Sequence, residues 1–223
     1  MTISKIKAVY FSATRTTQKV VRQIVATLSK ELGIPSEELD FTLPQQRQEP
    51  MVFDASDFVV FGVPVYAGRV PNVLVKYLNT MQGNGATALS IAVYGNRDFD
   101  DALIEATDIL GNSGMKVIAG GAFVGEHSFS TVLAAGRPDA DDLQKAAEFA
   151  RLVAEKIQRN DFSKPQIKGV PFPKPKQSVC ARRRQCASCP YRWPTPLQHV
   201  SKPLPIVQWR NVHMYSTHYL PML

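Results

Sequence analysis

Residues 58–71 read FVVFGVPVYAGRVP, which begins as a strand pattern and ends as a loop pattern. Phe58–Val63 is a continuous apolar run, typical of a strand that is buried on both faces. The loop that follows, Pro64–Pro71, has a proline at each end to stiffen the backbone and Gly68 to permit a tight approach or a positive φ. Such a buried strand is typical of a parallel sheet covered by helices on both sides.

Strand and helix patterns alternate on both sides of this run through the first 160 residues. The other predicted strands are Lys5–Ser12, Leu39–Leu43, Ala88–Tyr94 and Val117–Val124. The predicted helices are Thr17–Leu32, Pro71–Met81, Asp98–Leu110 and Asp139–Ile157. This alternation predicts an α/β fold with a five-stranded parallel sheet, and right-handed crossovers restrict its order to the flavodoxin-like or the dinucleotide-binding arrangement. In either, a ligand binds at the carboxyl ends of the strands.

The balance of basic and acidic residues changes at residue 160. Residues 1–160 hold 16 Lys+Arg and 18 Asp+Glu, whereas residues 161–223 hold 10 Lys+Arg and one acid. We expect an irregular basic C-terminal tail (161–223), because nine prolines between positions 165 and 205 disfavour helices and sheets. A basic extension can contact nucleic acid or an acidic partner, but a solvated extension without a ligand is the simpler interpretation. Nucleic acid is therefore not the partner that we expect.

The apolar runs and the cysteine count bear on the compartment. No apolar run is long enough to cross a bilayer, and the start, MTISKIK, lacks the apolar core of a signal peptide. Three cysteines also differ from the even number of a secreted disulfide framework. We expect a cytoplasmic protein without a membrane partner.

The loop Ser12–Thr17, between the first strand and the first helix, is rich in hydroxyl groups. Hydroxyls and free backbone N–H groups at a helix N-terminus suit a phosphate group. The loop has no glycine, so it matches neither the dinucleotide fingerprint nor the ATP-type phosphate loop. The alternative is a plain helix cap by Ser12 or Thr16.

Two further loops of the same sheet edge carry aromatic and polar groups. Tyr66 follows the third strand and Tyr94 the fourth, and a flat ring could stack on either. Ordinary packing is the alternative role for each tyrosine alone. Together with a phosphate loop, the set predicts a site for a flat ring with a phosphorylated tail.

The sequence resembles the flavodoxin superfamily, in particular bacterial proteins in which such a domain precedes a ferredoxin-type iron–sulfur segment. The matching stretches are VYFSATRTT (9–17), FGVPVYAGRVP (61–71), VYGNRDFDDAL (93–103), AFVGEHSFS (122–130) and AAGRPD (134–139). The resemblance implies a flavodoxin-like three-layer sandwich with strand order 2-1-3-4-5, and FMN as the cofactor. Arg15 stands where flavodoxins usually have glycine, and it either adds a phosphate contact or indicates a different loop path.

The resemblance also assigns the cofactor site. The residues at the phosphate would be Ser12, Thr14, Thr16 and Thr17, and Arg15 is a further candidate that the family pattern does not supply. Those on one side of the flavin ring would be Pro64, Val65, Tyr66 and Gly68, and those on the other Tyr94, Gly95, Asn96, Arg97 and Phe99. His127 follows the fifth strand at the same edge and is a candidate for a flavin or substrate contact, although a structural role is the alternative. No catalytic acid–base pair or nucleophile is expected.

Three functions remain open. The first is an FMN-binding electron-transfer protein with an unidentified redox partner protein. The second is an FMN-dependent NAD(P)H oxidoreductase that acts on quinones or similar acceptors. The third is a degenerate module that has lost the flavin and acts only through its basic tail.

The tail departs from a ferredoxin segment. A cluster requires a C-x2-C-x2-C-x3-C-P run, but Cys180, Cys186 and Cys189 are spaced x5 and x2 and have no fourth partner. We therefore expect no iron–sulfur cluster and no metal site. Residues 1–160 should fold and bind FMN alone, and the tail should form no domain of its own. Its apolar side chains could dock on the domain or on a second subunit of a homodimer.

Overall fold

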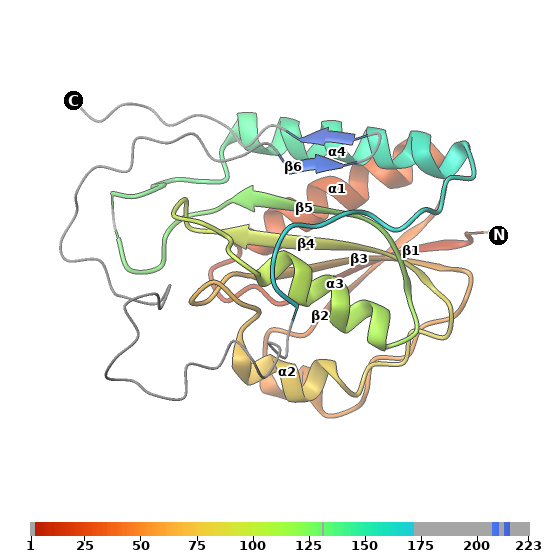
Figure 1. Ribbon diagram of the computed structural model, residues 1–223, viewed down its shortest axis with the longest axis horizontal. Helices are drawn as coiled ribbons and strands as arrows, with labels where there is room; N and C mark the ends of the chain where they lie inside the picture. The colour runs from red at the N-terminus through yellow and green to blue at the C-terminus, as the bar shows by residue number, and fades with distance from the viewer. Residues whose placement is uncertain (1–2, 131, 172–206, 210–211, 215–223) are drawn as a thin grey trace.

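A computed structural model of the chain describes residues 3–130, 132–171, 207–209 and 212–214. Among them, a five-stranded parallel sheet has the order β2-β1-β3-β4-β5 (Figure 1). The strands are β1 (Lys5–Tyr10), β2 (Ser36–Asp40), β3 (Asp57–Pro64), β4 (Thr87–Tyr94) and β5 (Lys116–Val124). The helices are α1 (Thr16–Leu32), α2 (Asn72–Leu78), α3 (Ala102–Asn112) and α4 (Ala140–Gln158), with a short 3-10 helix η1 (Pro44–Arg47). This order confirms the predicted flavodoxin-like α/β sandwich.

Helices cover both faces of the sheet. In Figure 1, α1 and α4 lie together on one face, and α2 and α3 lie on the other. The first face buries Val20, Ile24, Phe149 and Val153 from its helices. The second buries Leu74, Leu78, Ile109 and Leu110. Every residue of β3 before Pro64 is buried, as expected for a strand with a helical layer on each side.

The chain changes direction across the sheet at β1. It passes from β1 to its neighbour β2 on one side and then crosses to β3 on the other. The carboxyl ends of β1 and β3 therefore face the switch point, where open α/β sheets bind their ligands.

Several predicted boundaries differ from the structure. The second strand was predicted at Leu39–Leu43 but spans Ser36–Asp40. Its start is charged, and Glu37 pairs with Lys5 at 3.0 Å and Lys7 at 3.2 Å on the adjacent strand. Cross-strand ion pairs, rather than apolar alternation, thus mark this edge strand. The third helix begins at Ala102 rather than at Asp98, because a turn with a positive φ at Asp100 (43°) precedes it.

Residues 161–171 run along the domain, beyond the predicted boundary at residue 160. Phe162 and Ile167 are partly buried against the core. Further along the chain, β6 (Val207–Trp209) and β7 (Val212–Met214) pair in antiparallel fashion. The rest of the predicted tail, including the three cysteines, lies outside the described residues. In the part of the chain that the structure describes, no helix has the length and apolar character required to cross a membrane.

Candidate functional site

The β1–α1 loop is held at both ends by side-chain hydrogen bonds. The backbone N–H of Ser12 donates to Thr42 Oγ1 at 2.9 Å, and Ser12 Oγ accepts the backbone N–H of Gln18 at 3.0 Å. Ser12 thus accepts one N–H group from the first turn of α1, although the N-cap residue is Arg15, which makes no side-chain cap bond. The hydroxyl proton of Ser12 stays available for donation. Thr42 was not predicted from the sequence, because only the tertiary fold brings it to this loop.

Arg15, which precedes α1, adopts the left-handed conformation, with φ 62° and ψ 5°. Glycine adopts this conformation without strain, whereas other residues rarely do so. This agrees with the glycine that the resemblance places at position 15. The Arg15 side chain is exposed and forms no ion pair with any of the described residues.

Several hydrogen-bond donors of this loop have no partner among the described residues. Within the described residues, no hydrogen bond engages the backbone N–H groups of Ala13, Thr14, Thr16 and Thr17. The Oγ1 atom of Thr17 is buried and also has no partner there, while the residue is only 1% exposed. The nearby hydroxyls of Thr14 and Thr16 lie 3.2 Å apart. An unsatisfied buried hydroxyl costs about 1–3 kcal/mol, and the helix N-terminus at which this one lies is a position that favours anions.

The β3–α2 loop forms a tight turn that displays Tyr66. The backbones of Tyr66 and Arg69 exchange two hydrogen bonds of 2.9 and 3.0 Å, and φ is positive at both Ala67 (49°) and Gly68 (76°). A Cβ atom at Gly68 would lie 2.4 Å from Asp100 Oδ2, so space as well as φ requires glycine here. The exposed fraction of Tyr66 is 42%, which leaves its ring accessible.

The aromatic residue at which β4 ends and the β4–α3 loop begins is buried, unlike Tyr66 of the β3–α2 loop. Tyr94 is buried, with its ring edge-on to Phe99 at 5.6 Å. Asn96 and Arg97 are exposed. Of the two tyrosines predicted to stack on a flat ring, only Tyr66 is exposed in this structure.

The β5–α4 loop reaches the other two loops. A Cβ atom at Gly95 would lie 2.8 Å from His127 Cδ2, and one at Gly125 would lie 3.2 Å from Thr16 Cβ. His127 Nδ1 accepts the backbone N–H of Phe129 at 3.1 Å, which assigns the proton of a neutral ring to Nε2. The glycines let β5 approach the hydroxyl-rich loop and the β4–α3 loop. The predicted residues from all four loops therefore meet at one edge of the sheet.

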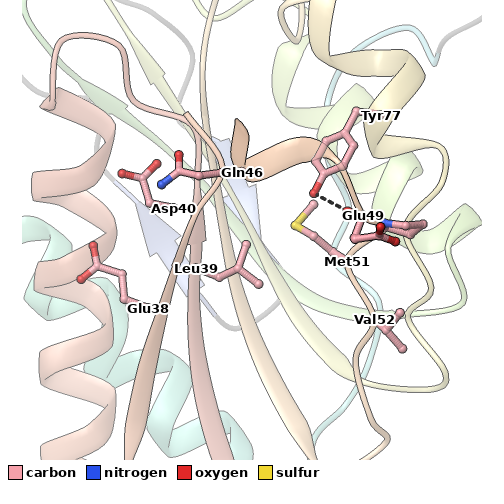
Figure 2. A pocket seen from close by; sticks show the side chains of 9 residues that line it. Glu38, Leu39, Asp40, Gln46, Glu49, Met51, Val52 and Tyr77 are labelled. Carbon is pink, nitrogen blue, oxygen red and sulfur yellow. Dashed lines mark hydrogen bonds between the residues drawn. The ribbon is translucent and has the colours of Figure 1, made fainter. Parts of the chain in front are cut away.

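A separate open pocket of about 590 Å³ lies beside β2 and includes none of the predicted site residues. Figure 2 shows Glu38 and Asp40 on one side and Tyr77, Glu49 and Met51 on the other. Tyr77 Oη donates to the Glu49 carbonyl at 3.2 Å, and burial raises the pKa of this phenol, which keeps it protonated. Among the described residues, no cluster of His, Cys, Asp and Glu could hold a metal ion.

Comparisons with known proteins reveal the fold. No protein-family model matches the chain, and no curated protein matches it. A solved flavone reductase has a TM-score of 0.51 at 13% identity, over 74% of this chain and 66% of its own. A flavodoxin from the domain Archaea has a TM-score of 0.46 at 15% identity, over 69% of this chain and 99% of its own. An azoreductase from Bacillus anthracis str. Sterne has a TM-score of 0.48 at 15% identity, over 69% of this chain and 100% of its own. At these identities, the likeness to the flavone reductase shows the fold alone.

Proposed function

We propose that the chain is an FMN-binding electron-transfer protein whose cofactor lies at the carboxyl edge of the sheet. The observation that carries this proposal is the buried Thr17 hydroxyl, which has no partner among the described residues. Its location at the start of α1, beside backbone N–H groups that also lack partners, supports a phosphate group as the missing acceptor.

The donor set fits a monophosphate. The hydroxyls of Ser12, Thr14, Thr16 and Thr17 can donate to phosphate oxygens, together with the N–H groups that have no partner among the described residues. The helix N-terminus adds a partial positive charge, and Arg15 adds a full one. No glycine-rich pyrophosphate loop is present in this segment, which favours a mononucleotide over a dinucleotide.

The two neighbouring loops supply the ring site. Tyr66 would stack on one side of the isoalloxazine, next to Pro64, Val65 and Gly68. On the other side, the backbone of Gly95 and the exposed Asn96 and Arg97 would contact its polar edge. Tyr94, Phe99 and His127 would support this second loop from behind. Bound FMN would supply one- and two-electron chemistry, which the protein tunes by these contacts.

The primary test uses the full-length protein. We expect it to be yellow, to release FMN on denaturation and to bind FMN more tightly than riboflavin. A chain that stays colourless after reconstitution contradicts the proposal and favours a module without flavin. Rapid consumption of NAD(P)H with a quinone acceptor favours the oxidoreductase instead.

Thr17→Val is the sharper test, because valine keeps the methyl group that faces β3 and removes only the hydroxyl. FMN affinity should fall about tenfold, equivalent to about 1.4 kcal/mol, while riboflavin affinity stays unchanged. The stability of the apoprotein should rise or stay level, since an unsatisfied buried hydroxyl is removed. Thr27→Val is the matched control: Thr27 is a buried residue of the same helix, but its hydroxyl donates to the Gln23 carbonyl. It should lower stability and leave FMN affinity unchanged.

A further inference from the structure

The segment that follows α4 crosses the domain and returns to the site edge. We call residues 161–171 the strap. It begins where Lys156 Nζ donates to the Ser163 carbonyl at 3.0 Å. It then passes β5, where a Cβ atom at Gly120 would lie 3.4 Å from Ile167 Cδ1, and reaches the start of α3 (Figure 1). There the backbone N–H of Val170 donates to Asp101 Oδ1 at 2.9 Å.

Arg69 joins the strap to the start of α3 through a hydrogen bond and two largely buried ion pairs. Its Nη1 atom donates to Asp101 Oδ2 at 3.1 Å and to the Val170 carbonyl at 3.2 Å. Its Nε atom pairs with Glu105 Oε2 at 3.0 Å. Only 19% of the Arg69 and Asp101 side chains and 5% of the Glu105 side chain are exposed. Water therefore screens these charges little, and each depends on the others to compensate its desolvation.

The same residues hold the loop that displays Tyr66. Glu105 Oε2 accepts the backbone N–H of Val70 at 3.0 Å, and the Gly68 carbonyl accepts the backbone N–H of Asp101 at 3.0 Å. Arg69 itself closes the turn with Tyr66. The loop is thus attached on both sides of Arg69 to Asp101 and to α3, and the strap is attached to two of the same residues, Arg69 and Asp101.

We propose that Arg69 and Asp101 are positioning residues for the flavin ring and that the strap completes their network, which rests on the proposed function. The strap fixes Asp101 and Arg69 from the solvent side, and these residues fix the turn that aims Tyr66. The ring site therefore depends on a segment about 100 residues away in sequence, since Arg69 and Val170 are 101 positions apart.

Gly169→Ala in the full-length chain should loosen the strap while it leaves every residue of the β3–α2 loop in place. Gly169 has φ 139°, and a Cβ atom there would lie 2.7 Å from Ile104 Cγ2 and 3.1 Å from Asp101 Oδ1. The matched control is Gly33→Ala at the end of α1. Gly33 also has a positive φ (68°), but its Cβ would meet no atom within 4 Å. Both variants introduce backbone strain, and only Gly169→Ala displaces the strap.

The first measurement is backbone hydrogen exchange without flavin. Relative to the control, Gly169→Ala should raise the exchange rates of residues 66–70 at least tenfold and leave those of β1 unchanged. If residues 66–70 of Gly169→Ala exchange at the same rates as in the Gly33→Ala control, the strap does not stabilise this loop and the inference is overturned. Arg69→Lys should restore part of the protection that Arg69→Met loses. Lysine keeps the charge, but it lacks the planar guanidinium whose Nε and Nη1 atoms donate in fixed directions.

The second measurement is flavin binding by the same variants. Gly169→Ala should weaken FMN and riboflavin alike, at least threefold each, because the strap acts on the ring site and not on the phosphate. Fluorescence of the bound flavin should rise as stacking on Tyr66 loosens. If the wild-type chain binds FMN and Gly169→Ala leaves the affinity and the fluorescence of the bound flavin unchanged, this inference is overturned and the proposed function stands. Failure of the wild-type chain to bind any flavin overturns the proposed function as well.

Discussion

The methyl group of Thr17 faces Gly62 across the contact between α1 and β3: a Cβ atom at Gly62 would lie 3.1 Å from Thr17 Cγ2. The same Cβ would lie only 2.3 Å from Val21 Cγ2. Glycine at this position therefore lets the first turn of α1 rest directly on the sheet. The burial of Thr17, and of its hydroxyl group that has no partner among the described residues, therefore depends on Gly62 in strand β3.

We expect Gly62→Ala to lower the free energy of unfolding by about 1–3 kcal/mol, because the added methyl group overpacks the contact between helix and sheet. FMN affinity should fall with it as α1 moves outward. Urea denaturation and FMN titration measure the two effects. The control is Gly111→Ala in α3, where the new Cβ meets no atom within 4 Å and alanine should stabilise the helix. If Gly62→Ala were as stable as the wild type, α1 would not pack as tightly on β3 at this position as we infer.

Arg15→Gly should separate stability from phosphate binding. Glycine removes the strain of a left-handed arginine, so we expect the apoprotein to gain about 1 kcal/mol. Loss of the guanidinium should weaken FMN three- to tenfold and reduce the salt dependence of binding. Arg15→Lys, which keeps both the charge and the strain, is the control in unfolding and titration experiments. Equal FMN affinity of all three proteins would show that Arg15 does not contact the phosphate.

The sequence predicted the central part of the fold because burial on both faces leaves a strong pattern. Phe58–Val63 matches β3 closely, and the loops after β1, β3, β4 and β5 meet at one edge as predicted. Edge strand β2 was misplaced, since cross-strand ion pairs and not apolar residues mark it.

The network of Arg69 could not be predicted from local sequence. Its partners are Asp101, the N-cap residue of α3, Glu105 within α3, and Val170 on the strap, and no periodicity links residues at such separations. Thr42 and Gly62 were missed for the same reason, because each acts on the β1–α1 loop from a different strand or loop. The sequence also predicted that a flat ring could stack on either tyrosine, but it could not distinguish the exposed Tyr66 from the buried Tyr94.

Asp139 should give α4 a pH-dependent cap. Its carboxylate accepts the backbone N–H of Asp142 at 3.0 Å, and this bond, with Arg137 nearby, holds the pKa of Asp139 below its ordinary value of 3.8. A lowered pKa in the folded state means stability that is present above pH 3.8 and lost as pH falls through the folded value. Asp139→Ala should cost about 1 kcal/mol at pH 7 and less at pH 3.

Asp139→Asn provides the matched comparison, because asparagine caps a helix without titrating. Its stability at pH 7 should stay close to that of the wild type. Urea denaturation at pH 7 and pH 3 measures both variants. A cost of Asp139→Ala that is equal at the two pH values would contradict the assignment.

A pair of shortened chains tests where the domain ends. Lys156 Nζ is buried and donates to the carbonyls of Ile118 at 2.9 Å and Ser163 at 3.0 Å, and burial lowers its pKa. A chain that ends at Asn160 loses the Ser163 acceptor and the apolar contacts of Phe162 and Ile167. We expect it to fold but to be less stable than the full chain by about 2–3 kcal/mol. A chain that ends at Pro171 keeps these contacts and should match the full-length protein in thermal unfolding and flavin content. Iron per chain should be nil in the full-length protein, because Cys180, Cys186 and Cys189 lack the fourth ligand that a cluster needs, and in both shortened chains, which contain none of these cysteines. Equal stability of the two shortened chains would place the domain boundary at residue 160, and stoichiometric iron in the full-length protein would assign the cysteines a cluster.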